Sequence, residues 1–427
     1  MDMLLTGGAV YQNGTLIPSD LCISDGRIIS VSPDLPRDGF SVIQVNDCLI
    51  FPGFVDVHVH LREPGFSYKE TISSGTAAAA AGGYTAVCAM PNLNPVPDSR
   101  KNLRAETKLI RRDASVRVYP YGAITVGQAG ETLADLEGMA ESVVAFSDDG
   151  HGVQDGELME RAMLRAKALD KPIVAHCEVN TLLTKGGCVH DGRWAEEHGF
   201  PGISSESEWR MVERDIGLVR KTGCRYHVCH ISTKESVALI RRAKAEGLPV
   251  TCETAPHYLL LCEDDLQDEG RFKMNPPVRS AEDRDALLAG LLDGTVDCIA
   301  TDHAPHSAEE KAKGLRGSAF GIVGLETAFP LLYTNLAETG LVPLTRLIEA
   351  LCLNPRRIFN LPGGKLEPGE VADLTVIRTE APHAVNPDEF RSQGRATPFA
   401  GWPVTAAVAL TVCGGEAVYG RLDNGKE

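Results

Sequence analysis

The 427-residue sequence predicts an α/β fold, a (β/α)8 TIM-like barrel with a small β-sandwich domain that is built from both ends of the chain. Two observations predict the barrel: eight short apolar runs have the character of strands, and helix-period segments separate most of them. A third observation predicts the small domain, because β-like runs with turn signals occupy both ends of the chain.

The barrel is expected to span residues 51–362. Its β-like runs are 54–60, 85–90, 117–125, 143–149, 172–177, 225–231, 249–254 and 297–302. Helix-period segments lie near 68–81, 99–112, 155–170, 206–221, 233–246, 281–293 and 324–337, with a weaker one near 132–141. Regular alternation of strand and helix implies parallel strands with crossover helices, and eight such units close a barrel.

The small domain is expected to combine residues 1–50 with residues 363–427. The first segment alternates short β-like runs with turns, and its Asp25-Gly26 pair is a hairpin signal. After Pro362 the β-like runs return. The simplest arrangement joins both ends in one domain, with the barrel inserted between them.

Composition limits the class of protein. The chain is 43% hydrophobic and 23% charged, as in an ordinary globular enzyme, and it has no run of the ~18–20 apolar residues that a membrane helix needs. The N-terminus has no basic segment followed by an apolar one, and the 12 cysteines form no short-spaced framework, so we expect a cytoplasmic protein with reduced thiols. A net charge of -16 argues against nucleic acid as a partner, but an anionic substrate can still bind in a locally cationic cleft.

The His-Val-His sequence at 58–60 is the most informative motif. Alternate side chains of a strand share a face, so His58, His60 and Asp56 are expected on one face and the intervening valines on the other. In a barrel of parallel strands, the valine face would pack under the outer helices. The histidine face would then lie at the inner rim, where enzymes of this fold build their sites.

Four further apolar runs end in residues of ligand type. Asp148 and Asp149 end the fourth run, and His176, His230 and Asp302 end the fifth, sixth and eighth. The carboxyl ends of parallel strands meet at one rim, so these side chains should converge with the two histidines. Four His and two Asp suit a divalent ion such as zinc, in one or two positions. Unrelated core histidines are the alternative, and this many coincidences argue against it.

These residues lie in motifs by which the chain resembles the amidohydrolase superfamily and, within it, the bacterial type I dihydroorotases, over essentially its whole length. The motifs are Asp56-Val-His-Val-His-Leu-Arg-Glu-Pro-Gly65, Met90-Pro-Asn92, Phe146-Ser-Asp-Asp-Gly150, Ala175-His-Cys-Glu178, His230-Ile-Ser-Thr233, Lys273-Met-Asn-Pro-Pro277 and Thr301-Asp-His-Ala-Pro-His306. The resemblance implies reversible closure of N-carbamoyl-L-aspartate to L-dihydroorotate, the third step of pyrimidine synthesis.

The resemblance also implies the metal ligands. They are His58, His60 and Asp302 for the first metal, and His176 and His230 for the second. Many relatives bridge the two ions with a carboxylated lysine at the end of strand four, where this chain has aspartate. Asp149 is expected in that role, with Asp148 as the alternative. We therefore expect two Zn²⁺ ions per chain, with one as the alternative.

Asp302 is the expected catalytic residue. Opening an amide ring at neutral pH needs a nucleophile, and zinc supplies one by lowering the pKa of water from about 15.7 to about 7. Asp302 is expected to take the proton and deliver it to the leaving ring nitrogen, and the order reverses in the biosynthetic direction. Its alternative role is to orient a histidine.

Substrate contacts are expected around the metals. Arg62 lies two positions beyond His60 on the same strand face and can hold a carboxylate through two parallel hydrogen bonds. A structural salt bridge is the alternative role for Arg62. The resemblance further implies substrate contacts from His60, Asn92, Asn275, His306, Phe320 and Gly321.

Some neighbouring residues have open roles. Residues 303–319 are polar and punctuated by glycine, so they form either a lid or a solvated connector. His227 lies three positions before His230 and has opposite strand parity, so we expect it to face the outer layer of the barrel. The other histidines with ligand chemistry are interpreted as structural or as neighbours of ligands: His151, His257 and His303.

Two other classes of function remain open. A related cyclic amidase, such as a hydantoinase or allantoinase, would share the barrel and the histidine pair, but Arg62, Asn92, Asn275 and the missing lysine argue against it. A metal-free scaffold that only binds aspartate transcarbamoylase would have lost ligands, and here all six positions are filled. A homodimer and an aspartate transcarbamoylase partner are expectations from the family alone.

Overall fold

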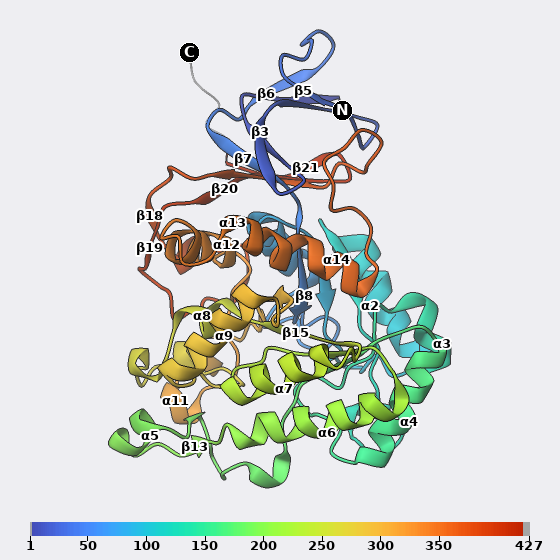
Figure 1. The fold of residues 1–427 in the computed structure, drawn as a ribbon, viewed down its shortest axis with the longest axis vertical. Coiled ribbons are helices and arrows are strands. Elements are labelled where there is room, and N and C mark those ends of the chain that lie inside the picture. Colours follow the sequence, from blue (N-terminus) through green and yellow to red (C-terminus); the bar gives the residue numbers. More distant parts are fainter. Residues whose placement is uncertain (1, 422–427) are drawn as a thin grey trace.

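The computed structural model describes residues 2–421 and has a small all-β part next to a larger barrel that is surrounded by helices (Figure 1). The blue and red strands of the small part come from opposite ends of the chain. The expected class, an α/β barrel with a small β-sandwich part, is confirmed. Within residues 2–421, no helix is long and apolar enough to cross a membrane.

Two sheets form the small part. The first has the order β5-β4-β1-β6 and consists of β1 (Met3–Thr6), β4 (Asp20–Ser24), β5 (Arg27–Ser32) and β6 (Ser41–Gln44). The second has the order β21-β20-β17-β7-β2-β3 and consists of β2 (Ala9–Gln12), β3 (Thr15–Pro18), β7 (Cys48–Pro52), β17 (Leu374–Arg378), β20 (Ala407–Cys413) and β21 (Glu416–Gly420).

The second sheet joins the two ends of the chain. Its strands β7 and β17 are antiparallel neighbours, with Ile50 opposite Val376. Both side chains are fully buried in one cluster with Leu5 of the first sheet. The domain boundaries at residues 50 and 363 stay predictions, and β7 continues to Pro52.

The barrel is built from parallel strands. They are β8 (Phe54–Val59), β9 (Tyr84–Ala89), β10 (Arg117–Pro120), β11 (Ile173–Ala175), β14 (Tyr226–Val228), β15 (Val250–Thr254) and β16 (Cys298–Ile299). The ring closes where Val59 bridges His303 in parallel, and the amide of His60 donates to the carbonyl of His303 at 2.8 Å. The first and last β/α units therefore lie side by side.

The fourth strand, expected at 143–149, is reduced to one bridging residue. Phe146 bridges Gly122 on one side and Ile173 on the other. Its neighbouring segments contribute Pro120 and Pro172, whose carbonyls accept from Val144 and Phe146 but which have no N–H to donate. The missing donors interrupt the regular ladder, so the prediction of a full strand was wrong here.

Helices cover the outside of the barrel. The main ones are α1 (Ile72–Ala81), α2 (Arg100–Asp113), α4 (Gly156–Ala168), α6 (Glu206–Thr222), α7 (Lys234–Ala245) and α9 (Ala281–Asp293). Shorter ones are α3 (Leu136–Met139), α5 (Arg193–His198), α8 (Pro256–Leu260), α10 (Ala308–Lys311), α11 (Gly314–Gly317), α12 (Ala328–Leu332), α13 (Leu344–Ile348) and α14 (Asn354–Phe359). The segment near 132–141, whose helical periodicity is weak, forms one helical turn, α3, followed by a 3-10 turn at Ala140–Ser142.

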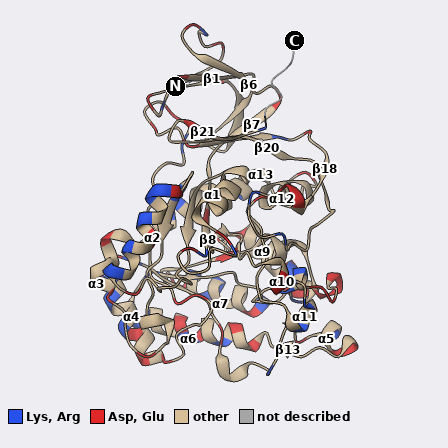
Figure 2. Ribbon diagram, turned by 180° about the vertical axis from the view of Figure 1, so that it is seen from behind, with Lys and Arg blue, Asp and Glu red and all other residues tan. Residues whose placement is uncertain are grey.

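Two short sheets lie outside the barrel ladder: β12 (Val189–His190) with β13 (Gly202–Ile203), and β18 (His383–Ala384) with β19 (Pro403–Val404). Charge is unevenly spread over the helices. Although the chain is acidic overall, lysine and arginine are concentrated along α2, which carries several blue segments in Figure 2. The same helix buries a glutamate, Glu106, on its inner face.

Candidate metal centre

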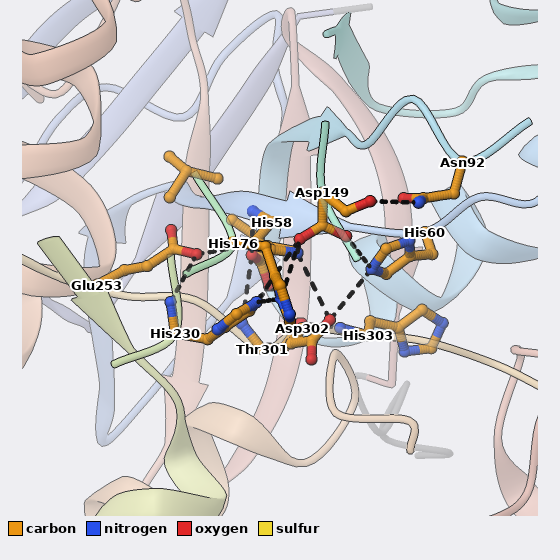
Figure 3. Close-up of polar contacts among 12 residues, drawn as sticks. His58, His60, Asn92, Asp149, His176, His230, Glu253, Thr301, Asp302 and His303 are labelled. Atoms are coloured by element: carbon orange, nitrogen blue, oxygen red, sulfur yellow. Dashed lines mark hydrogen bonds and ion pairs between the residues drawn. The ribbon is translucent and has the colours of Figure 1, made fainter. Parts of the chain in front are cut away.

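Six side chains converge at the rim where the barrel strands end (Figure 3). They are His58 in β8, His60 directly after β8, Asp149 after the Phe146 bridge, His176 after β11, His230 after β14, and Asp302 after β16. All six are at most 7% exposed. The structure therefore brings together the six residues that the sequence analysis expected as ligands, and the alternative, Asp148, is not among them.

Asp149 lies between two groups of histidines. Its Oδ1 is 3.4 Å from Nε2 of His58, 3.6 Å from Nε2 of His230 and 3.8 Å from Nδ1 of His176, and its Oδ2 is 3.5 Å from Nε2 of His60. Asp302 Oδ1 is 3.1 Å from Nε2 of His60 and 3.6 Å from Nε2 of His58. The result is a group of His58, His60 and Asp302 and a second group of His176 and His230, with Asp149 shared.

The donor set fits one or two divalent ions. Buried polar atoms are normally hydrogen-bonded, yet Nε2 of His58 and Oδ1 of Asp149 have no hydrogen-bond partner among residues 2–421. Burial raises the pKa of Asp149 and Asp302, but the neighbouring histidines outweigh burial and bring the pKa of both carboxyl groups below their usual range. Imidazole nitrogens with ionised carboxylates are the ligands that zinc prefers in catalytic sites.

Asp148 has a different environment from Asp149. Its Oδ1 accepts from the amides of Ile124 at 2.8 Å and Thr125 at 3.1 Å, and its Oδ2 accepts from the Thr125 hydroxyl. Asp148 thus ties its own segment to the loop after β10. The carboxylate that faces the histidines is that of Asp149.

The first strand does not alternate as expected. Val55 and Val57 pack in the barrel-interior cluster with Cys229 and Phe359, whereas Val59 packs in the outer cluster with the helices. The pairing of β8 with β9 shifts register between Asp56 and Val59, so a bulge changes the side-chain parity in the segment that contains His58. The predicted outward valine face is therefore wrong for Val55 and Val57.

Three site residues have a left-handed backbone. Their φ angles are 29° for His230, 48° for Asp302 and 61° for Arg62. Such angles are rare for residues other than glycine and cost free energy, and they gather where function requires a particular side-chain direction. All three residues lie at the rim where the barrel strands end.

The position of His227 contradicts the prediction, made from strand parity, that this residue faces the outer layer of the barrel. It is fully buried inside the barrel, with Nδ1 2.8 Å from the Thr251 hydroxyl, Nε2 3.2 Å from Oε2 of Glu253, and its ring centroid 5.1 Å from that of Phe359. The left-handed turn at His230 breaks the alternation from which the outer position was counted. His227 and Cys229 face inward, and His230 is turned inward as well.

Glu253 is a site residue that sequence reasoning missed. It is fully buried, and its Oε1 accepts from Nδ1 of His58 at 2.7 Å. Burial raises the pKa of Glu253, but His58 and His227 outweigh it and lower the pKa to about 2. The available signal was a glutamate within the apolar run 249–254, since glutamate is almost never fully buried without a partner.

The expected substrate residues surround the centre. Arg62 donates from Nε to the Pro305 carbonyl at 3.2 Å, and Asn92 donates from Nδ2 to the Asp149 carbonyl at 2.8 Å. Asn275 donates from Nδ2 to Oε1 of Glu178 at 3.1 Å, so Glu178 is a second residue that sequence reasoning left without a role. The Oδ1 atoms of Asn92 and Asn275 have no hydrogen-bond partner and remain as free acceptors among the described residues.

His306, Phe320 and Gly321 lie together in and after the loop 303–319. Nε2 of His306 donates to the Phe320 carbonyl at 2.7 Å. The Gly321 amide donates to the Lys273 carbonyl at 3.0 Å, so it is already used within the chain. The expected substrate contacts of Phe320 and Gly321 stay predictions.

Known proteins resemble this chain along its whole length. The family model described as "Dihydro-orotase-like" matches residues 47–236. Dihydroorotases of Bacillus cytotoxicus and Bacillus cereus are each 51% identical over 415 residues, which is 97% of this chain and 97% of theirs.

Solved structures share the fold. An L-hydantoinase (dihydropyrimidinase) from Arthrobacter aurescens superposes with a TM-score of 0.88 at 27% identity, covering 99% of this chain and 97% of its own. A dihydropyrimidinase from Brevibacillus agri has a TM-score of 0.85 at 20% identity, covering 98% and 95%. The barrel is thus of the amidohydrolase type. Within that class, the chain belongs to the dihydroorotase family.

Proposed function

We propose that this protein is a zinc-dependent dihydroorotase, which reversibly converts N-carbamoyl-L-aspartate to (S)-dihydroorotate and water in the third step of UMP biosynthesis. The observation that carries the proposal is the 51% identity to dihydroorotases over 97% of the chain. The site is compatible with that reaction, because a cationic arginine and two free amide oxygens lie beside the candidate metal centre.

The metals would be held by residues that already converge. His58, His60 and Asp302 would hold the first ion, His176 and His230 the second, and Asp149 would lie between them. Zinc bound there would polarise the scissile carbonyl and lower the pKa of water to about 7. We propose two ions per chain, with one as the alternative.

The chain's own residues would handle the proton and the substrate. Asp302 is ionised in the free site, so during ring opening its carboxylate can accept a proton and deliver it to the leaving ring nitrogen. Arg62 would hold the substrate carboxylate, and Oδ1 of Asn275 would accept a substrate N–H. His60, Asn92 and His306 would complete the contacts. Phe320 and Gly321 would contribute backbone contacts, although their carbonyl oxygens already accept from His306 and Lys311.

A hydantoinase-type activity is the second candidate, and the superposition on the Arthrobacter aurescens L-hydantoinase is the observation in its favour. The test is a direct comparison of kcat/KM for dihydroorotate, hydantoin and allantoin on one preparation, together with zinc counted per chain. We expect strong preference for dihydroorotate. Faster turnover of hydantoin or allantoin would overturn the proposal, and so would full activity of zinc-free protein.

Associations are proposed from the family alone. We propose a cytoplasmic homodimer, with aspartate transcarbamoylase as a partner and with no nucleic acid or membrane partner. Light scattering of the purified chain, alone and mixed with aspartate transcarbamoylase, tests the homodimer and the association with aspartate transcarbamoylase. A monomer at micromolar concentration would remove the dimer.

A further inference from the structure

The four histidines of the centre differ in the hydrogen-bond partner of their outer ring nitrogen, the one that faces away from the centre. Nδ1 of His58 donates to Glu253 at 2.7 Å. The corresponding outer nitrogens of the other three have no hydrogen-bond partner among the described residues: Nδ1 of His60, Nε2 of His176 and Nδ1 of His230. The nearest carboxylate oxygen to Nε2 of His176 belongs to Glu178 and is 3.8 Å away, too far for a hydrogen bond.

Glu253 is itself held rigidly. Its second oxygen, Oε2, lies 3.2 Å from Nε2 of His227, whose Nδ1 lies 2.8 Å from the Thr251 hydroxyl. His58, Glu253 and His227 are all fully buried. The His230 amide also donates to Oε1 of Glu253, at 3.4 Å. The carboxylate is therefore held by two histidine side chains and one backbone amide, and Figure 3 shows it beside the histidines of the centre.

This contact determines the protonation pattern of one imidazole. Because Nδ1 of His58 donates a hydrogen bond to Glu253, the neutral imidazole keeps its proton on Nδ1 and presents the lone pair of Nε2 to the centre. A carboxylate partner also makes the imidazole a stronger donor to a metal. Among the described residues, the outer nitrogens of the other three histidines have no such partner, so no carboxylate fixes their metal-binding tautomer in this way.

We propose that Glu253 is a positioning residue that makes the His58 position of the centre the tighter metal site and leaves the His176–His230 position as the weaker, exchangeable one. The inference rests on the metal-dependent function proposed above. The two positions share Asp149 and each has two histidines, and the first also has Asp302. The inference assigns a further part of the difference in affinity to one buried contact, that of His58 with Glu253.

The test is a zinc titration of metal-free protein against a competing chromogenic chelator. Wild type should show two affinities. Glu253→Gln keeps the size and can still accept from His58, but it removes the charge. Loss of such a partner typically weakens metal binding ~10–100-fold. We expect that loss for the tighter affinity of Glu253→Gln, with the weaker one changed less than about threefold.

Glu106→Gln is the matched control. Glu106 is also a buried glutamate, but it lies on α2, one of the helices that cover the outside of the barrel. Its substitution should leave both zinc affinities as in wild type. Affinities of Glu253→Gln within twofold of wild type would overturn the proposal, as would an equal loss at both positions.

Two further measurements separate this inference from folding and from the proposed function. In ¹⁵N-histidine-labelled, metal-free wild type, a slowly exchanging Nδ1–H signal of His58 should be present, and it should weaken or move in Glu253→Gln; its absence from wild type contradicts the proposal without any variant. Dihydroorotate turnover is measured on the same samples. Two distinct zinc affinities without turnover would remove the proposed function and leave the role of Glu253 intact.

Discussion

At the scale of single residues, Asp302 offers the sharpest test. Its Oδ1 lies 3.1 Å from His60 and 3.6 Å from His58, and the pKa of its carboxyl group is below the usual range. Asp302→Asn keeps the shape but cannot accept a proton at working pH. We expect kcat to fall by ~10²–10⁴-fold. Steady-state kinetics with dihydroorotate measure the loss.

Asp302→Asn needs two controls, because the same residue is a proposed ligand. Zinc content shows whether the loss follows from metal release, and circular dichroism with thermal unfolding shows whether the fold is intact. A fall in kcat below about tenfold, in a zinc-loaded and folded variant, would remove Asp302 from the proton-transfer role.

Arg62 tests how the substrate is selected. Its guanidinium can make two parallel bonds to a carboxylate, whereas a lysine ammonium is a point charge. Arg62→Lys should lower kcat/KM for dihydroorotate roughly ten- to a hundredfold, since a charge-assisted hydrogen bond is worth ~1.5–3 kcal/mol. A small cyclic imide without the carboxylate should react almost as before. Equal losses on both substrates would mean that Arg62 supports the site and does not bind the carboxylate.

Glu106 makes a prediction about stability. It is 2% exposed, its Oε2 has no hydrogen-bond partner within residues 2–421, and burial raises its pKa well above the usual value. The unfolded chain ionises this group near its ordinary pKa while the folded chain keeps the proton. The folded state therefore loses stability as pH rises from the unfolded pKa towards the folded one.

Glu106→Met removes that pH-dependent loss. We expect the free energy of unfolding at pH 8 to rise by ~1–3 kcal/mol, the usual cost of a buried unsatisfied polar group. The gain should shrink towards pH 4.5. Urea unfolding at pH 4.5, 6 and 8 measures it, and a constant or negative difference would contradict the assigned environment.

At the scale of elements, the loop 303–319 is anchored by one buried lysine. Nζ of Lys311 donates to the carbonyls of Lys273 at 3.0 Å, Ala319 at 2.7 Å and Gly321 at 2.6 Å. Lys311→Met leaves those carbonyls without their donor. The loop should then open ~10-fold or more often, because hydrogen bonds to charged groups contribute ~1.5–3 kcal/mol.

Hydrogen exchange of the loop amides measures this opening. KM for dihydroorotate should also rise, because His306 belongs to the same loop. Lys313→Met is the matched control, since Lys313 is exposed. Unchanged exchange in Lys311→Met, or the same change in both variants, would show that Lys311 does not anchor the loop.

Sequence patterns predicted most helices and strands because the local apolar periodicity of most barrel segments agrees with the element that they form. The six long helices and most strands lie where apolar periodicity placed them, and strand-end residues met at one rim because parallel strands require it. The pattern failed where backbone geometry departs from its regular form. Two prolines interrupt the fourth strand, and a bulge in β8 and the left-handed turn at His230 change parity.

The remaining site features depend on contacts that no pattern contains. Asp148 and Asp149 are adjacent and chemically equal, and only the bonds from Ile124 and Thr125 separate them. Glu253 lies in a strand with no ligand at its tip, so counting strand ends could not reveal it. Its role appears only when β8 and β15 are seen packed together.

At the scale of the whole molecule, the two ends of the chain depend on each other. β17 contributes the fully buried Leu374, Val376 and Ile377 and covers β7 in the second sheet. A chain that ends at residue 362 lacks β17, β20 and β21, so β7 becomes an uncovered apolar edge. We expect such a chain to aggregate.

Soluble yield and light scattering measure the effect of that truncation. Co-expression of residues 363–427 as a separate chain should restore part of the soluble yield, because it supplies the missing strands. A soluble, zinc-binding chain of residues 1–362 would show that the small part is not built from both ends as a unit.

The seam at which the barrel closes has a consequence for synthesis in the cell. His60 and Asp302 face each other across it although they are 242 positions apart in the chain. At ~5–20 residues per second, a ribosome needs roughly 12–48 s to pass from one to the other. Throughout that interval the nascent chain displays a histidine pair whose carboxylate does not yet exist. Correct metal loading must therefore wait for nearly the whole barrel, and any ion captured earlier is held by an incomplete and less selective set of ligands.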